Sequence, residues 1–241
     1  MITGASRGLG RAMALSLSNA GATVALVARD VAKLEGVQLE IEAAGGRAGV
    51  FPADVTKEED VARVARDAES QLGPVQILIN NAGINIRKYV VDFSLAEWRS
   101  VMDTNHTSAF LMCRAIVPQM QKSGWGRVLN IASTMAHVSI PARAAYSSSK
   151  GALLGLTRAL ALELATQNIT VNSMSPGPFA TEINAALIED PEANRQFIAN
   201  VPMGRWGRLE EAGSLACYLC SEEASFVTGA DFVIDGGWCA R

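Results

Sequence analysis

The sequence predicts a doubly wound α/β fold, a parallel sheet of about seven strands flanked by helices on both faces. Along the 241 residues, short apolar segments typical of buried strands alternate with longer segments of helical periodicity. Small or polar residues follow several strands, as in Asn80-Asn-Ala-Gly83, which is typical of the ligand-binding edge of an open parallel sheet. No linker, repeat or composition shift interrupts this alternation. We therefore expect a single domain over residues 1–241.

Composition narrows the function classes. Hydrophobic residues make up 49% of the chain, charged residues 19%, and the net charge is -3, which describes a compact globular protein. The chain has no basic cluster, which argues against nucleic acid or an anionic membrane surface as the main partner. No apolar run reaches the ~18 residues of a membrane span, and no cleavable signal stands at the start. We expect a soluble, cytoplasmic protein.

The first element is a strand that ends in a glycine turn. Only Met1 and Ile2 precede Thr3-Gly-Ala-Ser-Arg-Gly-Leu-Gly10, so the chain begins inside this strand, and we expect either missing upstream residues or a short strand. A helix-period segment follows at 11–17. Glycines between a strand and a helix let the backbone approach a pyrophosphate, which the helix N-terminus favours. The G-x3-G-x-G spacing therefore predicts a dinucleotide site, although any tight turn can need glycine.

The second strand, residues 23–27, ends in a segment that bears on cofactor choice. Ala28 and Arg29 follow it, where a carboxylate would favour NAD and a cation would favour the 2′-phosphate of NADP. Arg7, inside the glycine turn, could supply a second charge to that phosphate. Asp30 is expected to cap the next helix. The alternative is that both arginines are solvated surface residues.

The middle of the chain continues the alternation. A strand at 48–51 leads to Asp54-Val55, and residues 57–72 have the spacing of a surface helix. A buried strand at 75–79 comes next. Ser94 and Glu97 form a capping-box signature, which predicts a long helix that passes Asn105 and extends toward Met120.

The last third supplies two strands, two helices and a long connection. The expected strands are 169–174 and 232–235, and the expected helices are 146–164 and 210–219. Residues near 178–209 have weak periodicity and lie at a strand end, where a long segment is more often a functional lid than a plain connector. Cys217 and Cys220 form C-x-x-C, but no second pair or His follows at ligand spacing, so we interpret them as core residues and expect no metal.

The stretch from Ser133 to Lys150 carries the expected chemistry. Tyr146 and Lys150 are four residues apart, which places them on one face of a helix. A tyrosine loses its proton near pH ~10, and a neighbouring positive charge moves that pKa toward the range useful for acid–base catalysis. Ser133 follows the strand at 127–132 and could aim its hydroxyl at the phenol. Tyr-x-x-x-Lys is common by chance, so its weight depends on the rest of the chain.

Together these segments resemble the short-chain dehydrogenase/reductase family over essentially the whole chain. They occur in the family's order and near its spacing: residues 3–10, residues 80–83, Asn105, Ser133, Tyr146, Lys150, Pro176-Gly177 and Thr181. The departure is the missing start of the first strand. The resemblance implies a Rossmann-type sheet and a hydride transfer between a nicotinamide cofactor and a carbonyl or secondary alcohol.

The resemblance also implies a role for each catalytic residue. Tyr146 would protonate the carbonyl oxygen during reduction or take the hydroxyl proton in the reverse direction. Lys150 would lower the proton affinity of the phenol and hold the nicotinamide ribose. Ser133 would orient the substrate oxygen, and Asn105 would hold a water that relays protons to Lys150.

The cofactor contacts follow from the same resemblance. Asp54 would meet the adenine, Asn81 to Gly83 the adenosine-side ribose region, and Thr181 the carboxamide. Arg7 and Arg29 resemble the NADP(H)-preferring branch, so we expect NADP(H) over NAD(H). The complete expected set is Gly4, Ser6, Arg7, Gly8, Leu9, Gly10, Arg29, Asp54, Val55, Asn81, Ala82, Gly83, Tyr146, Lys150, Pro176, Gly177, Phe179 and Thr181.

The substrate is less constrained. Cations in the segments expected to line the pocket suit a sugar acid or ketose, as in gluconate 5-dehydrogenase-type members; they are Arg87, Lys88, His137, Arg143 and Arg195. The alternatives are a 3-oxoacyl thioester or general ketone reductase, which shares most of these motifs, and a non-catalytic cofactor-sensing protein. The usual sign of the latter is replacement of Tyr146 or Lys150, and neither is replaced.

Family members commonly pair their last helix and last strand across two-fold axes. Residues 212–220 and the apolar end at Trp238 are consistent with such a contact, although a monomer core would look similar. The expected assembly is a homotetramer or a homodimer.

Overall fold

A seven-stranded parallel sheet is the centre of the computed structural model, which describes residues 1–240. Buried β-branched and aliphatic side chains fill most of its strands, as expected for a sheet covered on both faces. The strands are β1 (Ile2–Thr3), β2 (Val24–Ala28), β3 (Ala48–Pro52), β4 (Ile77–Asn80), β5 (Gly126–Ile131), β6 (Ile169–Pro176) and β7 (Asp231–Ile234).

The strand order places the functional edge. The order is β3-β2-β1-β4-β5-β6-β7, so the chain moves outward in one direction from β1 to β3 and then returns to begin the other half at β4. Ligands of open α/β sheets bind at this reversal, outside the carboxyl ends of the strands. The predicted doubly wound, Rossmann-type sheet is confirmed.

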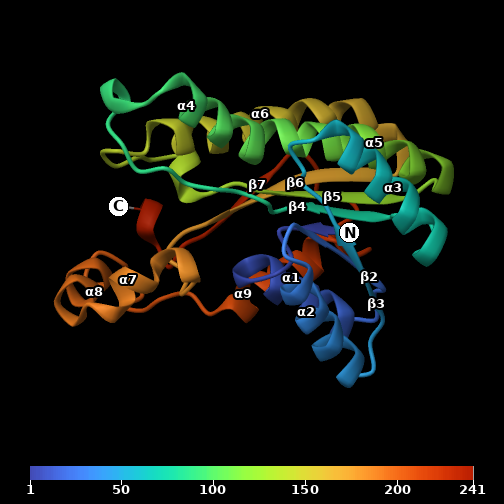
Figure 1. The fold of residues 1–241 in the computed structure, drawn as a ribbon, viewed down its shortest axis with the longest axis horizontal. Coiled ribbons are helices and arrows are strands. Elements are labelled where there is room, and N and C mark those ends of the chain that lie inside the picture. The colour runs from blue at the N-terminus through green and yellow to red at the C-terminus, as the bar shows by residue number, and fades with distance from the viewer. Residues whose placement is uncertain (241) are drawn as a thin grey trace.

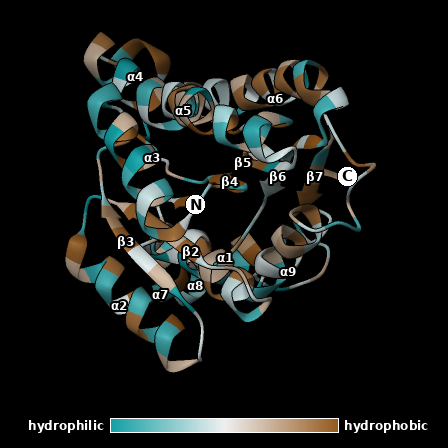
Figure 2. Ribbon diagram, turned by 90° about the vertical axis from the view of Figure 1, so that its right-hand side faces the viewer, coloured by the Kyte–Doolittle hydropathy of each residue, from teal (hydrophilic) through white to brown (hydrophobic). Residues whose placement is uncertain are grey.

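Helices cover the two faces in separate layers (Figure 1). On one face α3 (Glu58–Leu72), α5 (Ser108–Ser123) and α6 (Ala144–Leu164) bury one apolar cluster against the sheet, and α4 (Leu95–Met102) packs on α6. On the other face α1 (Gly8–Asn19), α2 (Val31–Ala43) and α9 (Leu209–Leu219) bury a second cluster. Hydrophilic and hydrophobic residues alternate along helices such as α2 (Figure 2), as expected where one side faces the core.

The long helix predicted from Ser94 past Asn105 is interrupted. The capping box forms, because Ser94 Oγ accepts from the Glu97 amide at 3.2 Å and Glu97 Oε2 accepts from the Ser94 amide at 2.9 Å. However, residues Asp103–Thr107 form a π-helical turn between α4 and α5. Such turns are inserted into α-helices frequently at functional sites, and this one contains Asn105.

Residues 178–209 form an excursion beyond the carboxyl end of β6 (Figure 1). The excursion contains the short helices η5 (Glu182–Asn184), α7 (Ala185–Glu189) and α8 (Pro191–Ile198). Phe197 stacks on Trp206 with ring centroids 5.0 Å apart and lies 5.2 Å from Trp238. Phe197 of α8 thus packs against Trp206, which precedes α9, and against Trp238, which follows β7.

The remaining short helices are single turns. They are η1 (Val90–Asp92), η3 (Thr134–Ala136), η4 (Ala165–Gln167) and η6 (Trp238–Ala240). In residues 1–240 no helix is long and apolar enough to cross a membrane. The cytoplasmic location stays a prediction.

The C-x-x-C pair packs in the core as predicted. Cys220 is buried in the cluster under α9, and Cys217 is partly buried against the same cluster. Burial raises the pKa of Cys220 to about 12, which opposes formation of the thiolate needed for redox chemistry or metal binding. Within the described residues, no three His, Cys, Asp or Glu side chains gather into a group that could hold a metal.

Candidate active site

The glycine turn between β1 and α1 is too close to its neighbours for larger residues. A Cβ at Gly10 would lie 2.2 Å from the Gly4 carbonyl oxygen and 2.5 Å from Asn81 Nδ2. Gly4 has φ +65°, and a Cβ there would meet the Asn81 side chain at 2.9 Å. Glycine is therefore required for both the close approach and the left-handed backbone. The turn leaves the N-terminus of α1 open to the cleft, the arrangement that binds a pyrophosphate.

Asn81 braces this turn from β4. Its Nδ2 donates to the carbonyls of Thr3 at 2.9 Å and Gly4 at 3.2 Å. In return, Thr3 Oγ1 accepts from the amides of Asn81 at 2.9 Å and Ala82 at 3.1 Å. The ends of β1 and β4 are thus fixed together, and the floor of the site is preorganised at the switch point.

Cations stand at the far end of the cleft. Arg29 is exposed, and in the described part of the chain no carboxylate lies within ion-pair distance of it. Burial raises the pKa of the nearby Asp54 carboxyl, but bonds from Thr56 and the charge of Arg29 outweigh this and hold that pKa below its ordinary value. Arg7 is not free, because its Nη1 pairs with Glu182 Oε2 at 2.8 Å.

Ser133 and Tyr146 meet as predicted. Ser133 follows β5, is buried, and its Oγ accepts from the Met135 amide at 3.1 Å. Burial raises the pKa of the Tyr146 phenol above its ordinary value of 10.0, while the hydrogen-bonding contact with the Ser133 hydroxyl and the charge of Arg143 lower it. The net direction is upward. This differs from the expectation that a neighbouring ammonium would lower that pKa, because desolvation of the phenolate outweighs the favourable contacts.

Lys150 lies beneath the phenol in the interior. Its Nζ is 5.8 Å from the centroid of the Tyr146 ring and donates to the Ile131 carbonyl at 2.6 Å. Burial lowers the pKa of Lys150 from 10.5 to about 8. This amino group can therefore donate a proton as the ammonium and accept one as the amine at about pH 8, and it is not a permanent charge.

Asn105 sits behind the cleft rather than on its wall. The π-turn directs its side chain at Ile84, whose amide donates to Oδ1 at 2.7 Å and whose carbonyl accepts from Nδ2 at 2.9 Å. The same Nδ2 donates to Ser149 Oγ at 2.9 Å. A Cβ at Gly83 would lie 3.3 Å from Asn105 Oδ1 and 3.6 Å from Lys150 Nζ, so the Gly83 backbone runs close to both atoms. The water relay between them stays a prediction.

One cleft of about 940 Å³ joins these groups. It runs from Arg29 to Trp238, and the predicted catalytic and cofactor-binding residues line it with the exception of Asn105. The volume, the open helix N-terminus and the side-chain-free approaches at Gly4 and Gly10 fit a dinucleotide with room for a second small molecule. The predicted set on its wall is Gly4, Ser6, Arg7, Gly8, Leu9, Gly10, Arg29, Asp54, Val55, Asn81, Ala82, Gly83, Ser133, Tyr146, Lys150, Pro176, Gly177, Phe179 and Thr181.

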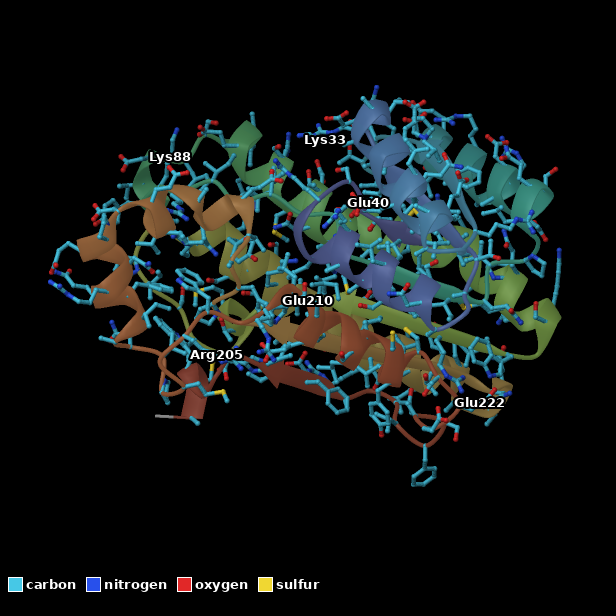
Figure 3. All side chains as sticks on the ribbon, turned by 90° about the horizontal axis from the view of Figure 1, so that it is seen from below. Lys33, Glu40, Lys88, Arg205, Glu210 and Glu222 are labelled. Atoms are coloured by element: carbon cyan, nitrogen blue, oxygen red, sulfur yellow. The ribbon has the colours of Figure 1, made fainter. Side chains whose placement is uncertain are left out.

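The five cations predicted to line the pocket separate into two groups. Arg87 and Arg143 line the cleft. Lys88, at the periphery of the molecule (Figure 3), pairs with Glu97 of α4, and the exposed Arg195 pairs with Glu192. His137 points away to Asp231 on β7. The prediction was thus wrong for Lys88, His137 and Arg195, because each side chain pairs with a nearby carboxylate.

Other residues on the wall escaped the sequence analysis. Glu182 faces Arg7, and Trp238 lines the end near Phe197. Asn85 lines the wall beside Arg87, and its Oδ1 is buried with no hydrogen-bond partner among the described residues. Nothing in the local sequence distinguishes these side chains from surface residues. They are found only when distant segments are brought together.

Comparison with known proteins agrees with this geometry. The family model described as enoyl-(acyl carrier protein) reductase matches residues 4–239. Gluconate 5-dehydrogenase of Gluconobacter oxydans (strain 621H) is 36% identical over 237 residues, which cover 98% of this chain and 93% of that protein. The chain belongs to the short-chain dehydrogenase/reductase family.

Other relatives of this short-chain dehydrogenase/reductase carry different names. The 3-oxoacyl-(acyl-carrier-protein) reductase FabG of Aquifex aeolicus (strain VF5) is 34% identical over 238 residues, covering 98% of this chain and 95% of that protein. Among solved structures, gluconate 5-dehydrogenase from Burkholderia cenocepacia J2315 in complex with NADP and tartrate superposes with a TM-score of 0.95 and 31% identity. That match covers 100% of this chain and 94% of the other.

The family and its relatives define the reaction class. They place this short-chain dehydrogenase/reductase among the enzymes that oxidise a CH–OH group or reduce a C=O group with NADP(H). The chain is an oxidoreductase of this type.

Proposed function

We propose that this chain interconverts a secondary alcohol and a ketone of a sugar acid with NADP(H), in one domain that holds both cofactor and substrate, with residues 178–209 as the substrate lid. The observation that carries the substrate class is the pair Arg87 and Arg143 on the wall of the cleft. The gluconate 5-dehydrogenases among its relatives support the same class.

The two arginines form a site for an anion. Burial lowers the pKa of Arg143, the charge of Arg87 lowers it further, and only Tyr146 raises it. The Arg143 guanidinium donates to the Ala142 carbonyl at 3.3 Å, and within residues 1–240 neither arginine has an ion-pair partner. Arg143 is partly buried and Arg87 is exposed, and two like charges side by side repel each other unless an anion offsets them. A substrate carboxylate near Tyr146 would do so.

The proton is handled by Ser133, Tyr146 and Lys150. NADP(H), when bound, supplies or accepts the hydride. Tyr146 donates its phenolic proton to the forming alkoxide during reduction and takes it back during oxidation, while Ser133 orients the same oxygen. Lys150, with its pKa of about 8, can exchange that proton near neutral pH. Asn105 holds the Ile84 backbone that closes the cleft on this side.

The choice of NADP(H) over NAD(H) rests on Arg29 and Arg7. Both line the cleft, and the position after β2 holds no carboxylate to receive a ribose hydroxyl. The relative solved with NADP supports this choice.

A 3-oxoacyl thioester is the second candidate. Ile140, Leu187 and Phe197 contribute apolar surface to the cleft, which would suit an acyl chain, and one relative is a 3-oxoacyl reductase. This candidate does not need two arginines beside Tyr146, since the thioester carbonyl itself is uncharged.

The deciding assay compares substrates in both directions. Gluconate oxidation, ketogluconate reduction and acetoacetyl thioester reduction are measured with NADP(H) and with NAD(H). We expect kcat/KM to be highest for the sugar acid with NADP(H). Turnover of the thioester without turnover of any sugar acid would replace the first candidate by the second. Binding of NADPH without turnover of any of these substrates would instead indicate a protein that senses the cofactor without this catalysis.

Arginine variants test the anion site directly. Arg87→Met and Arg143→Met should each raise KM for the sugar acid about tenfold or more, since each removes a charge-assisted contact. Turnover of a small neutral ketone should change much less. Arg158→Met, at an exposed position of α6, is the matched control. Equal losses on charged and neutral substrates would contradict the anion site.

We also propose that four copies assemble. Exposed apolar side chains lie around α9 and β7, the elements expected to pair: Tyr218, Phe226 and Val233. A second set of exposed apolar side chains belongs to the segment before α4, to α4 and to α5; it consists of Val91, Leu95 and Phe110. Two separate apolar faces on one chain are what a tetramer with two kinds of two-fold interface needs. Light scattering measures the assembly.

A further inference from the structure

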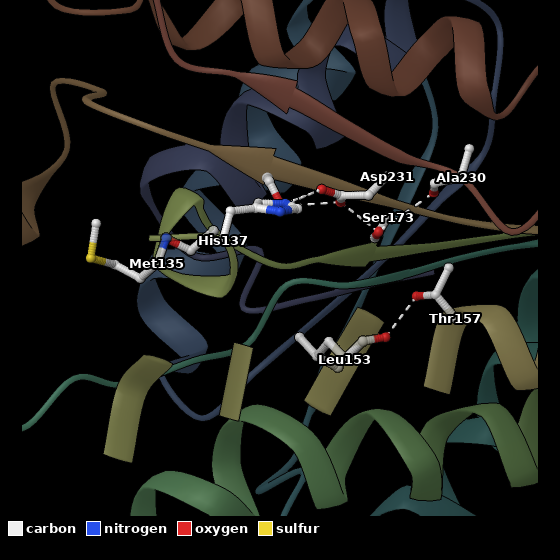
Figure 4. Close-up of polar contacts among 9 residues, drawn as sticks. Met135, His137, Leu153, Thr157, Ser173, Ala230 and Asp231 are labelled. Atoms are coloured by element: carbon white, nitrogen blue, oxygen red, sulfur yellow. Dashed lines mark hydrogen bonds and ion pairs between the residues drawn. The ribbon is translucent and has the colours of Figure 1, made fainter. Parts of the chain in front are cut away.

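A polar cluster lies behind the turn that carries Ser133. His137 Nε2 is 2.6 Å from Asp231 Oδ2. Asp231 also accepts from Ser173 Oγ at 2.5 Å and from Ser175 Oγ at 2.8 and 3.0 Å. Figure 4 shows His137 reaching from its turn to the carboxylate on β7. Neither His137 nor Asp231 lines the cleft.

The carboxylate end of this contact is rigid. Ser173 and Ser175 are fully buried on β6, and Asp231 opens β7 in register with Ser173. Both serine hydroxyls point their hydrogens at Asp231, so its oxygens are acceptors and His137 Nε2 must carry the proton that it shares. Because two buried donors fix Asp231 within the sheet, the carboxylate is a fixed anchor for the imidazole.

The imidazole end belongs to the catalytic turn. His137 directly follows η3, which begins after Ser133. Within this turn the Ala136 amide donates to the Ser133 carbonyl at 2.8 Å, and the His137 amide donates to the Thr134 carbonyl at 3.0 Å. These bonds make residues 133–137 one tight unit. A displacement of His137 is therefore transmitted to Ser133.

We propose that His137 is a positioning residue, which through Asp231 fixes the 133–137 turn against the sheet and so keeps the Ser133 hydroxyl on the Tyr146 phenol. The inference rests on the proposed proton-handling role of Ser133. The contact joins residues 94 apart in sequence. Within residues 1–240, the two side chains make their polar contacts with each other and with Ser173 and Ser175 of β6.

The effect should be visible at Tyr146 without any substrate. The Ser133 contact lowers the pKa of the phenol, so a displaced Ser133 leaves that pKa higher. Phenolate formation is followed by ultraviolet difference spectroscopy in the full chain, and the Tyr146→Phe spectrum is subtracted to isolate this tyrosine. His137→Leu should move the titration to higher pH, as should Ser133→Ala. His137→Gln keeps an N–H donor toward Asp231 and should restore the position of the wild type.

Kinetics give the second readout. With the best substrate, His137→Leu should lower kcat on the order of tenfold, as expected for a misplaced catalytic contact, and should leave the Kd of NADPH unchanged. In the Ser133→Ala background, His137→Leu should add nothing further, because the two residues act through one contact. Asp231→Asn retains the shape of the Asp231 side chain. It should change both the Tyr146 titration and kcat in the same direction as His137→Leu, but by smaller amounts.

The outcomes separate the inference from the proposed function. An unchanged Tyr146 titration in folded His137→Leu would overturn the positioning role whatever the substrate proves to be. So would a full additional loss in the Ser133→Ala background, or a shift that His137→Gln does not reverse. If His137→Leu does not fold, the Asp231→Asn and His137→Gln titrations decide the same question. A shifted titration with no turnover of any sugar acid would support the inference and overturn only the proposed substrate.

Discussion

At the residue scale, the site depends on groups whose charge is opposed by burial. Tyr146 has a raised pKa and Lys150 a lowered one, and desolvation is the first cause of both. Tyr146 therefore stays a neutral phenol at neutral pH, whereas Lys150 can lose its proton at about pH 8. A neutral phenol beside an amino group that titrates at about pH 8 can pass a proton in either direction more readily than a permanently ionised pair.

The burial of Lys150 predicts a stability difference between the protein and Lys150→Met. Below pH 8 the lysine is protonated in both states, and its burial lowers the free energy of unfolding. Between about pH 8 and 10.5 the folded state releases the proton first, so the unfolded state binds more protons and stability rises with pH. Relative to Lys150→Met, the wild type should gain up to about 3 kcal/mol across this window.

Urea unfolding at a series of pH values measures this difference. Both proteins contain Tyr146, so its own titration largely cancels when the two curves are subtracted. A flat difference between pH 7 and 10 would show that the ammonium is not desolvated in the folded protein. Lys122→Met, at an exposed position near the end of α5, should show no such slope.

Individual site residues were predictable where chemistry repeats with fixed spacing. Tyr146, Lys150 and Ser133 lie together because one helix turn and one strand end bring them there. His137 was placed in the pocket by its nearness to Ser133 in sequence, yet it turns toward Asp231. A carboxylate on another strand decides the direction of an imidazole, and no local pattern records that partner.

At the scale of elements, the glycine turn and the 178–209 segment are joined by the ion pair of Arg7 with Glu182. Both side chains are more than half exposed, so the pair contributes modestly, within about 1 kcal/mol. The 2′-phosphate of NADP would compete with Glu182 for the same guanidinium. The pair therefore connects cofactor choice to the segment that covers the cleft.

We expect Glu182→Gln to bind NADPH two- to fivefold more tightly, roughly the range that an exposed ion pair allows, and to bind NADH as before. Arg29→Ala should weaken the binding of NADPH and leave the binding of NADH unchanged. Calorimetric titration measures both constants. Glu192→Gln, which removes another exposed carboxylate of the same segment, is the control. Weaker binding of both cofactors by Glu182→Gln would mean that the pair instead holds the segment over the bound nucleotide.

The element boundaries show where sequence reasoning fails. The capping box at Ser94 predicted a helix start, and the structure confirms it. The π-turn at Asp103–Thr107 had no such signal, because it depends on the bonds of Asn105 with Ile84, a residue 21 positions away. The helix departs from regular α-helical geometry where it presents the side-chain amide of Asn105 to the Ile84 backbone. Hydrophobic periodicity alone cannot reveal such a departure.

At the scale of the molecule, the arrangement of the sheet was predictable for a physical reason. Parallel strands joined by helices require right-handed crossovers, and the glycine turn marks β1 as the strand at the reversal. Together these constraints leave few possible strand orders. The apolar surface around α9 and β7 was anticipated as a contact, but the sequence did not distinguish core positions from exposed ones, because both kinds are apolar.

Phe226 tests the proposed assembly at that surface. Its side chain is fully exposed in the segment between α9 and β7, and Tyr218 and Val233 nearby are also exposed. Burying such side chains against a second copy removes apolar surface from water at about 25 cal/mol per Å², whereas a carboxylate buried there would lack a partner. Phe226→Asp should therefore convert the tetramer into dimers by light scattering. Leu39→Asp, a matched change at an exposed position of α2, should leave the mass unchanged. A monomeric wild type, or a Phe226→Asp protein with the same mass as the wild-type tetramer, would rule out this interface.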